Sequence, residues 1–323
     1  MTIRSGMSGD AVTRIEQFLA DRKLYLGKVD GTFGGGVEAA LKTFQNQQGL
    51  SPTGAVDAAT WCRMFPNDPP PASEIAARPL AERCLALTGS FETGKYPPDC
   101  FCGITGDFDQ MGLSFGALQW NVGQGTLQPL LVQMFDRHPD VARNIFHEHF
   151  DTVATLRTSS LPDQLAFTRS VQTRGQVQEP WQGMLMALGR TPEFQLIQTG
   201  NACKVFEEAV GMCEDYGLVS ERAAALMFDV ATQGGCISAI VRAQIMADFS
   251  QLPQTNAGNE VAKMCIVANR RAAASISKYV DDVRTRKLAI AHGAGTVHGI
   301  YYDLSDMFGL TLNPFGNALA ATT

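Results

Sequence analysis

Two carboxylic acids in one glycine-rich stretch have the residue types and spacing for acid–base chemistry. Glu92 and Asp109 lie within Ser90–Asn121, which reads SFETGKYPPDCFCGITGDFDQMGLSFGALQWN. Its glycines and prolines predict short extended pieces joined by tight turns. A turn of this kind can hold one acid across a groove from another, the arrangement that glycosidic cleavage uses. On spacing alone, Glu92 as a helix cap and Asp109 as a turn aspartate are equally consistent with the sequence.

A helix is expected to position the first of these acids. Residues 76–89 place apolar side chains at helical spacing. Gly89 and Gly94 are expected to stop this helix, so that Glu92 hangs at its C-terminal end. Asp107 is the alternative second acid, because it shares a face with Asp109 if this limb is extended.

The run Asp109–Gly116, D-x-x-G-x-S-x-G, resembles the catalytic hairpin of family-46 chitosanases, members of the lysozyme-like superfamily. The resemblance implies Glu92 as general acid, Asp109 as general base and Ser114 as the hydroxyl that helps hold a water. Met111 stands where the chitosanases carry Arg, which weakens the case for chitosan but not for the acid pair.

The next turn, Gly116-Ala117-Leu118-Gln119, is similar to the G-L-M-Q turn of goose-type lysozymes and lytic transglycosylases. We therefore expect sugar contacts from the side chains on and around this hairpin, namely Asp107, Gln119, Trp120 and Asn121.

The first 65 residues resemble a peptidoglycan-binding domain. Motifs occur in order: R-x-G-M-x-G-D-A-V (Arg4–Val12), G-x-V-D-G-x-F-G (Gly27–Gly34) and T-G-A-V-D-x-x-T-W (Thr53–Trp61). The resemblance implies a three-helix module that binds peptidoglycan, with helices expected near 10–22, 37–48 and 57–64. Asp30 and Trp61 are our candidates for wall contact. Residues 66–75 contain three consecutive prolines and predict a semi-rigid linker.

The remainder, residues 76–323, predicts a mostly α, lysozyme-like domain with a small β-hairpin. Helical patterns cover 126–137, 140–157, 162–170, 181–188, 192–215, 219–232, 235–248 and 257–291, the last interrupted near Ser277.

Two further sets of residues each allow two interpretations. Asp229 and Gln233 share a helix face at i, i+4 among apolar residues, and a buried acid needs a partner. They either touch sugar from the groove wall or form an internal ion pair, for which Arg270, Arg284 and Arg286 are candidate partners. His298, near two tyrosines, either lines the sugar groove or packs the C-terminal tail.

The amino-acid composition narrows the class of protein and its partners. The chain has 323 residues, 45% hydrophobic and 18% charged, with a net charge of −6. These values predict about two globular domains and give no electrostatic reason to expect nucleic acid or membrane as partners. Neither Cys100-x-Cys102 nor His147-x-His149 has the spacing of a metal site, so we expect no metal and no cofactor. A monomer is expected.

Three classes of function compete. The first is a muramidase-type glycosidase that cuts the glycan strand of peptidoglycan, with a lytic transglycosylase, which needs one Glu, as its variant. The second is a stem-peptide amidase or peptidase, with Cys100 or Cys102 as nucleophile and His292 or His298 as base. The third is a binding protein without catalysis. We favour the first, because the third leaves the acid pair and Ser114 without a role.

The cellular setting stays open. The opening MTIRSGMSGDAV has no hydrophobic signal core, so Sec export is not expected. A wall-cutting enzyme made in the cytoplasm would then reach the periplasm by holin-dependent release, as an endolysin, or by a secretion machine, as an antibacterial effector. An effector would also imply an immunity protein.

Overall fold

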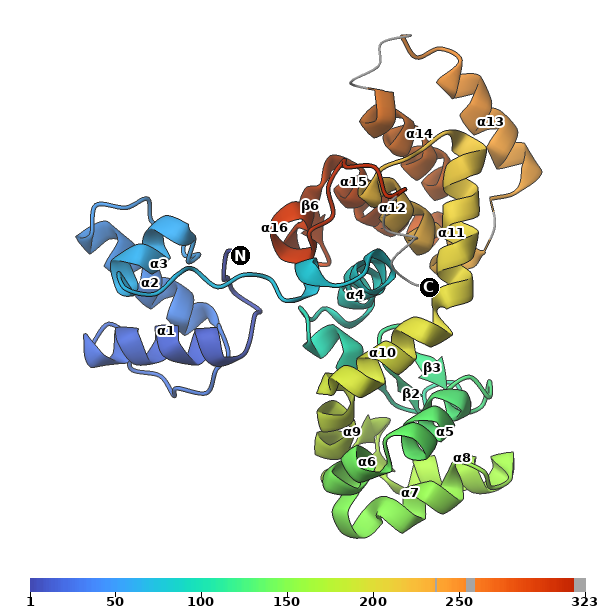
Figure 1. Ribbon diagram of the computed structural model, residues 1–323, viewed down its shortest axis with the longest axis horizontal. Coiled ribbons are helices and arrows are strands. Elements are labelled where there is room, and N and C mark those ends of the chain that lie inside the picture. Colours follow the sequence, from blue (N-terminus) through green and yellow to red (C-terminus); the bar gives the residue numbers. More distant parts are fainter. Residues whose placement is uncertain (236, 254–258, 317–323) are drawn as a thin grey trace. The chain divides into compact units, whose positions relative to one another are not determined.

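The computed structural model describes residues 1–235, 237–253 and 259–316 of a mostly helical protein (Figure 1). The chain divides into two compact units. The first comprises Met1–Ala77 and Tyr302–Gly309, and the second comprises Arg78–Tyr301 and the residues from Leu310 onward. The predicted mostly α class is confirmed.

The first unit contains the three predicted helices, α1 (Asp10–Asp21), α2 (Gly35–Gln47) and α3 (Ala58–Met64). It also includes a 3₁₀ turn (Ile75–Ala77) and α16 (Leu304–Phe308) from the far end of the chain. The Asp306 carboxylate accepts the Thr2 N–H at 2.7 Å, which ties α16 to the N-terminus. Nothing in the sequence motifs indicated that residues 302–309 belong to this unit.

The two candidate wall-contact residues of this unit differ in exposure. Trp61 is only 2% exposed and packs against Phe65, while its indole N–H donates to the Asp68 carbonyl at 3.2 Å. Asp30 is exposed on a turn whose backbone N–H groups are held by the buried carboxylate of Glu16. Asp30 is therefore the better placed of the two to meet a polymer at the surface.

The second unit begins with α4 (Leu80–Thr93) and a 3₁₀ turn (Asp99–Cys102), followed by a three-stranded antiparallel sheet. Its strands are β1 (Ile104–Thr105), β2 (Ser114–Phe115) and β3 (Trp120–Asn121). The elements up to α10 are α5 (Gln128–Arg137), α6 (Pro139–Phe146), α7 (Phe150–Leu156), α8 (Leu161–Ser170), β4 (Gln172–Thr173), β5 (Gln176–Val177), α9 (Trp181–Arg190) and α10 (Pro192–Asn201). A core of apolar side chains from β2, β3 and α5–α10 holds them together.

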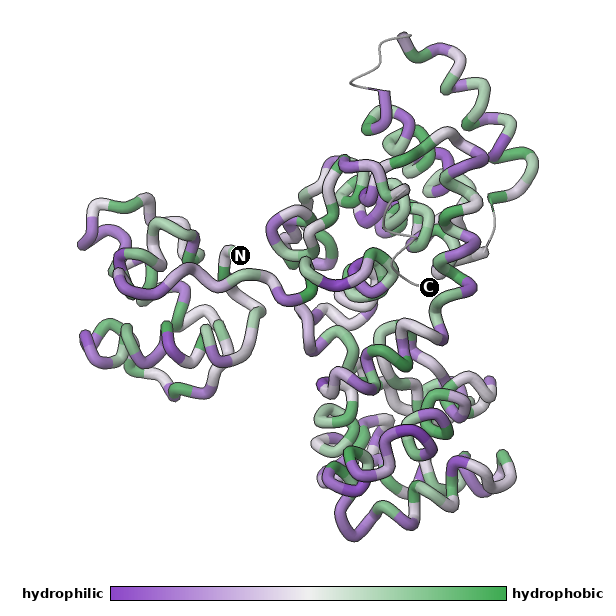
Figure 2. Tube along the Cα trace, viewed as in Figure 1, coloured by the Kyte–Doolittle hydropathy of each residue, from purple (hydrophilic) through white to green (hydrophobic). Residues whose placement is uncertain are grey.

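A second group of helices completes this unit (Figure 1). It consists of α11 (Cys203–Tyr216), α12 (Glu221–Gly234), α13 (Ala239–Phe249), α14 (Asn259–Ala273), a 3₁₀ turn (Ser277–Tyr279), α15 (Val280–His292), β6 (Ala294–Val297) and β7 (Ile300–Asp303). Helix α12 packs against α4, α11 and α15. Hydrophobic and hydrophilic residues are interspersed along these helices (Figure 2).

Several helices begin or end at other residues than predicted. The predicted helix 192–215 is two helices, α10 and α11, because the chain turns at Ala202. The predicted helix 140–157 is also interrupted, at His147, which has a positive φ of 45°. The break near Ser277 is present as predicted. The helix predicted from 235 begins at Ala239, and the helix start predicted at 257 lies outside the described residues.

Gly89 does not stop α4, contrary to the prediction. The helix continues to Thr93 and ends at Gly94, which adopts the left-handed conformation (φ 66°). A Cβ on Gly89 would lie 2.7 Å from the Ala117 Cβ and 3.2 Å from its Cα. Glycine is therefore needed for close approach of the hairpin to α4, and Glu92 lies in the last turn of the helix, as predicted.

This contact gives a test of the packing. Gly89→Ala should destabilise the second unit by roughly 1–3 kcal/mol, because the added methyl collides with Ala117. Gly211→Ala in α11, where no atom beyond the local helix backbone lies within 4 Å of the new Cβ, should instead stabilise by up to about 1 kcal/mol through helix propensity. Urea denaturation measures both, and Gly89→Ala with Ala117→Gly should recover most of the loss. Equal effects of the two single substitutions would show that the helix does not need glycine at 89.

Candidate active site

Glu92 is a partly exposed acid held by a buried cation. Its side chain is 35% exposed, and the Arg286 guanidinium of α15 donates to it at 2.7 Å through Nη1. A carboxylate near the C-terminal end of a helix meets the negative end of the helix dipole, which is unfavourable. Arg286 compensates for that charge and fixes one Glu92 oxygen.

Arg286 is in turn held by Asp229 of α12. Its Nε donates to Asp229 Oδ1 at 2.8 Å, and Lys287 Nζ donates to Oδ2 at 2.8 Å. Lys287 also donates to Gln233, at 2.8 Å. Asp229 is 0% exposed, so the internal ion pair is the arrangement that the structure shows. Asp229 holds Arg286, the partner of Glu92, whereas Gln233 contacts Lys287, and Asp229 presents no surface to a sugar.

Glu92, Asp229, Arg286 and Lys287 form one cluster. Its charges balance, because it holds two carboxylates and two cations. Burial raises the pKa of Asp229, but Arg286 and Lys287 outweigh burial and hold that pKa below its usual value. Burial lowers the pKa of Arg286, yet Asp229 and Glu92 bring it above the usual value. Burial lowers the pKa of Lys287. Asp229 therefore stays ionised across the neutral range.

The two acids of the hairpin have different surroundings. Asp107 accepts the Gly112 N–H at 3.0 Å and the Arg169 Nε at 2.9 Å. Burial raises the pKa of Asp107, but these two hydrogen bonds outweigh it and keep the pKa low. Asp109 is exposed, and within the described part of the chain it accepts only the Met111 N–H, at 3.1 Å, in a local turn. Asp107 therefore builds the loop, while Asp109 is the acid presented to solvent.

The strands of the hairpin brace the remaining candidate residues. Ser114 pairs with Asn121 across β2 and β3, and the Asn121 amide donates to the Ser114 hydroxyl at 2.9 Å. Asn121 is buried, so it orients Ser114 more directly than it can contact a substrate. Gln119 donates to the Gly116 carbonyl at 2.9 Å and accepts the Thr105 hydroxyl. Trp120 is half-buried on β3.

Sequence reasoning missed Gln198 of α10. This buried side chain accepts the Ala117 N–H at 2.8 Å and donates to the Phe101 carbonyl at 3.0 Å. It thereby satisfies two backbone groups of the hairpin region that have no strand partner. The only sign of this role in the sequence is a glutamine directly after Ile197, within an otherwise ordinary helical pattern.

His298 stabilises the end of α4. Its Nδ1 lies 3.3 Å from the Phe91 carbonyl and its Nε2 lies 2.5 Å from Asp282. These contacts place His298 against the residue before Glu92, while its two predicted roles, lining the sugar groove and packing the C-terminal tail, stay predictions.

The cysteine chemistry considered above lacks support. Cys100 and Cys102 are buried, and burial raises the pKa of both thiols, that of Cys102 to about 12. A thiol that stays protonated is a poor nucleophile. His292 lies near Cys265 instead, with Nε2 at 3.9 Å from the sulfur.

The described ranges hold neither a metal-binding cluster nor a helix that could cross a membrane. Residues 1–235, 237–253 and 259–316 contain no group of three His, Cys, Asp or Glu placed to hold a metal ion. Within the same ranges, every helix is too short or too polar to span a bilayer.

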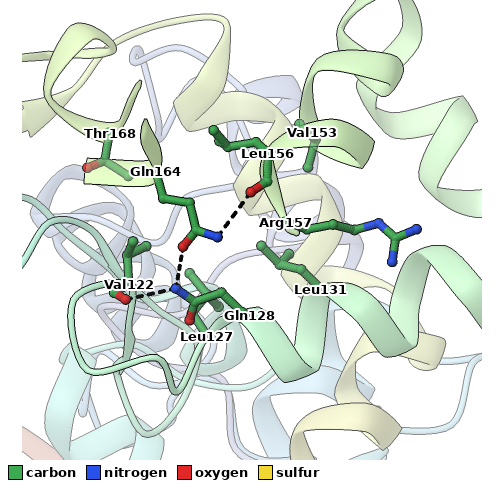
Figure 3. A pocket seen from close by; sticks show the side chains of 9 residues that line it. All are labelled: Val122, Leu127, Gln128, Leu131, Val153, Leu156, Arg157, Gln164 and Thr168. Atoms are coloured by element: carbon green, nitrogen blue, oxygen red, sulfur yellow. Dashed lines mark hydrogen bonds between the residues drawn. The ribbon is translucent and has the colours of Figure 1, made fainter. Parts of the chain in front are cut away.

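A small cavity lies among α5, α7 and α8 (Figure 3). Its wall is mainly apolar, and the Gln128 amide there donates to the Val122 carbonyl at 2.8 Å and to Gln164 at 2.5 Å. None of the candidate catalytic side chains lines it. The cavity is thus separate from the acid pair.

Comparison with known proteins identifies the first unit. Residues 8–64 match the family described as "Putative peptidoglycan binding domain". The protein therefore carries a peptidoglycan-binding domain, as the motifs in residues 1–65 predict, followed by a second, larger helical unit.

Among solved structures, the chain is similar to two chitosanases. One is "co-crystal structure of chitosanase OU01 with substrate", with 17% identity, a TM-score of 0.43, and coverage of 69% of this chain and 94% of that one. The other is "Chitosanase complex structure", with 16% identity, a TM-score of 0.42, and coverage of 69% and 95%. No curated protein matches the chain.

The buried cluster makes a prediction about stability. Asp229→Asn leaves Arg286 and Lys287 without their shared anion and should lower the free energy of unfolding by about 3–5 kcal/mol at neutral pH. Asp248→Asn breaks the exposed pair with Arg270 and should have little effect. Urea denaturation distinguishes the two.

The contribution of Asp229 to the free energy of unfolding should depend on pH. The folded-state pKa of Asp229 lies below its unfolded value, so its stabilisation is full above the unfolded value and is lost as pH falls through the folded value. The difference between wild type and Asp229→Asn should therefore shrink below about pH 4. A difference independent of pH would show that the charge of Asp229 is not what stabilises the cluster.

Proposed function

We propose that this protein is a glycoside hydrolase of the muramidase type that cuts the glycan strand of peptidoglycan. The observation that carries the proposal is the setting of Glu92. It is a half-exposed acid at the end of α4, fixed through one oxygen by a buried Arg286–Asp229 pair. A catalytic acid needs this combination of access and fixed orientation.

The second acid of the proposal, Asp109, is carried by the loop between β1 and β2. A Cβ on Gly103, at the base of β1, would lie 2.4 Å from the Thr93 Cγ2, the residue next to Glu92. Gly89 and Ala117 make a second close approach one helical turn earlier. The segment that leads into β1 therefore packs on the same end of α4 as Glu92, which supports placing the loop that carries Asp109 near that acid.

The proposed chemistry divides the work between the two acids. Glu92 protonates the leaving glycosidic oxygen, and Asp109 removes a proton from a water that attacks the opposite face of the sugar. Ser114, oriented by Asn121, helps hold that water. This sequence of events inverts the configuration at the anomeric carbon.

The substrate is proposed from the first unit. A peptidoglycan-binding domain raises the local concentration of the enzyme at an insoluble wall. The cell wall is therefore the proposed site of action, reached either by holin-dependent release or by delivery through a secretion system.

Substitution of the two acids tests the proposal. Glu92→Gln and Asp109→Asn should each lower the rate of wall lysis about 100- to 10,000-fold, because each removes a proton-transfer group. Asp140→Asn, an exposed acid on α6, is the matched control and should leave the rate unchanged. Loss of turbidity of purified walls measures lysis, and lysis by Glu92→Gln at the wild-type rate would refute the proposed acid.

The products separate the competing chemistries. Mass spectrometry of the digest should show new hydrated reducing ends, since water enters the cleaved bond. Anhydro ends would indicate a lytic transglycosylase, and free stem peptides an amidase or peptidase. A double Cys100→Ser, Cys102→Ser variant should digest walls as wild type does. A parallel digest of chitosan tests the glycan that the resemblance of Asp109–Gly116 to family-46 chitosanases implies.

A further inference from the structure

Phe108 is an aromatic side chain in an unusual place. It stands between Asp107 and Asp109 and is 73% exposed. Most phenylalanines of the second unit are buried in its cores, among them Phe91, Phe101 and Phe115. Leaving such a ring in water forgoes about 1.5–3 kcal/mol of burial. The sequence offers no packing reason for an aromatic residue at this position.

The backbone that carries Phe108 is held on both sides. The Asp107 N–H donates to the Gln172 side chain at 2.8 Å, and the Phe108 N–H donates to the Gly106 carbonyl at 3.0 Å. The Asp107 carboxylate is fixed by Gly112 and Arg169. The ring is therefore presented from an ordered loop, which lowers the entropy that a ligand must remove on binding.

The position of the ring is also fixed. One edge lies against Gly175, in the turn between β4 and β5. A Cβ on Gly175 would come 2.8 Å from the Phe108 Cε1 and 3.3 Å from its Cδ1. Gly175 also has a positive φ of 74°. The second hairpin thus supports one edge of the ring, while most of its surface remains open to solvent.

We propose that Phe108 is a platform on which one pyranose ring of the glycan stacks, beside the position of Asp109. The inference rests on the proposed function, because it places the sugar at the same acid. A pyranose has an apolar face of C–H groups that covers an aromatic ring well, and aromatic contacts are worth about a kilocalorie per mole beyond burial. Stacking there would set the sugar next to the residue that activates water.

Binding measured without turnover tests this role. The probe is a soluble, peptide-free tetrasaccharide of alternating N-acetylglucosamine and N-acetylmuramic acid, titrated by calorimetry into the full chain carrying Glu92→Gln. Adding Phe108→Ala should weaken binding about tenfold. Phe108→Trp should keep the affinity within about threefold, because the larger ring still stacks.

The matched control is Ile240→Ala on α13, an apolar side chain that is 74% exposed, and it should not change the affinity. In the active enzyme, Phe108→Ala should raise KM more than it lowers kcat. The first unit is the same in every variant, so its contribution to binding cancels.

The outcomes separate this inference from the proposed function. Equal affinity with Phe, Ala and Trp at position 108 would overturn the platform, whether or not the enzyme cleaves walls. Tight binding that depends on Phe108, combined with no cleavage by the wild type, would support the platform and refute the hydrolase. Absence of binding by any variant would refute both. An affinity loss shared by Ala and Trp, with a lower melting temperature, would mean that Phe108 only supports the loop.

Discussion

The second unit depends on a buried cation that must be neutralised. Arg286 lies in the interior and takes its anions from two other helices, Asp229 from α12 and Glu92 from α4. Because an unpaired buried charge costs several kcal/mol, the three helices are constrained to one arrangement. Lys287 is the second cation and completes the balance at Asp229. The same interaction that holds the helices together therefore also orients the candidate catalytic acid.

The hairpin depends on close contact more than on charge. Glycine at 89 and 103 lets β1 and the 116–119 turn approach α4 at distances that any Cβ would prevent. Gln198 then satisfies backbone groups at that turn and at Phe101. These contacts hold the segment before β1 and the 116–119 turn against the end of α4 that carries Glu92, which suits a site that must be accurately positioned.

Neighbouring carboxylates acquire different roles from their surroundings. Asp107 has its oxygens engaged by Arg169 and Gly112 and serves the loop, while Asp109, two residues later, faces solvent. Asp229 is fully buried between two cations and Glu92 is half-exposed beside one of them. Environment, and not residue type, thus separates supporting acids from the proposed catalytic pair.

The sequence by itself determined the helical class, the peptidoglycan-binding module and the placement of Glu92 in the last turn of a helix. These follow from local signals: helical periodicity, glycine turns and ordered motifs. Only the tertiary structure decided that Arg286, and not Arg270 or Arg284, pairs with Asp229, that Gly89 serves packing, and that residues 302–309 join the first unit. Each of these depends on residues far apart in the chain, and no local pattern records which distant side chain or backbone a residue will meet.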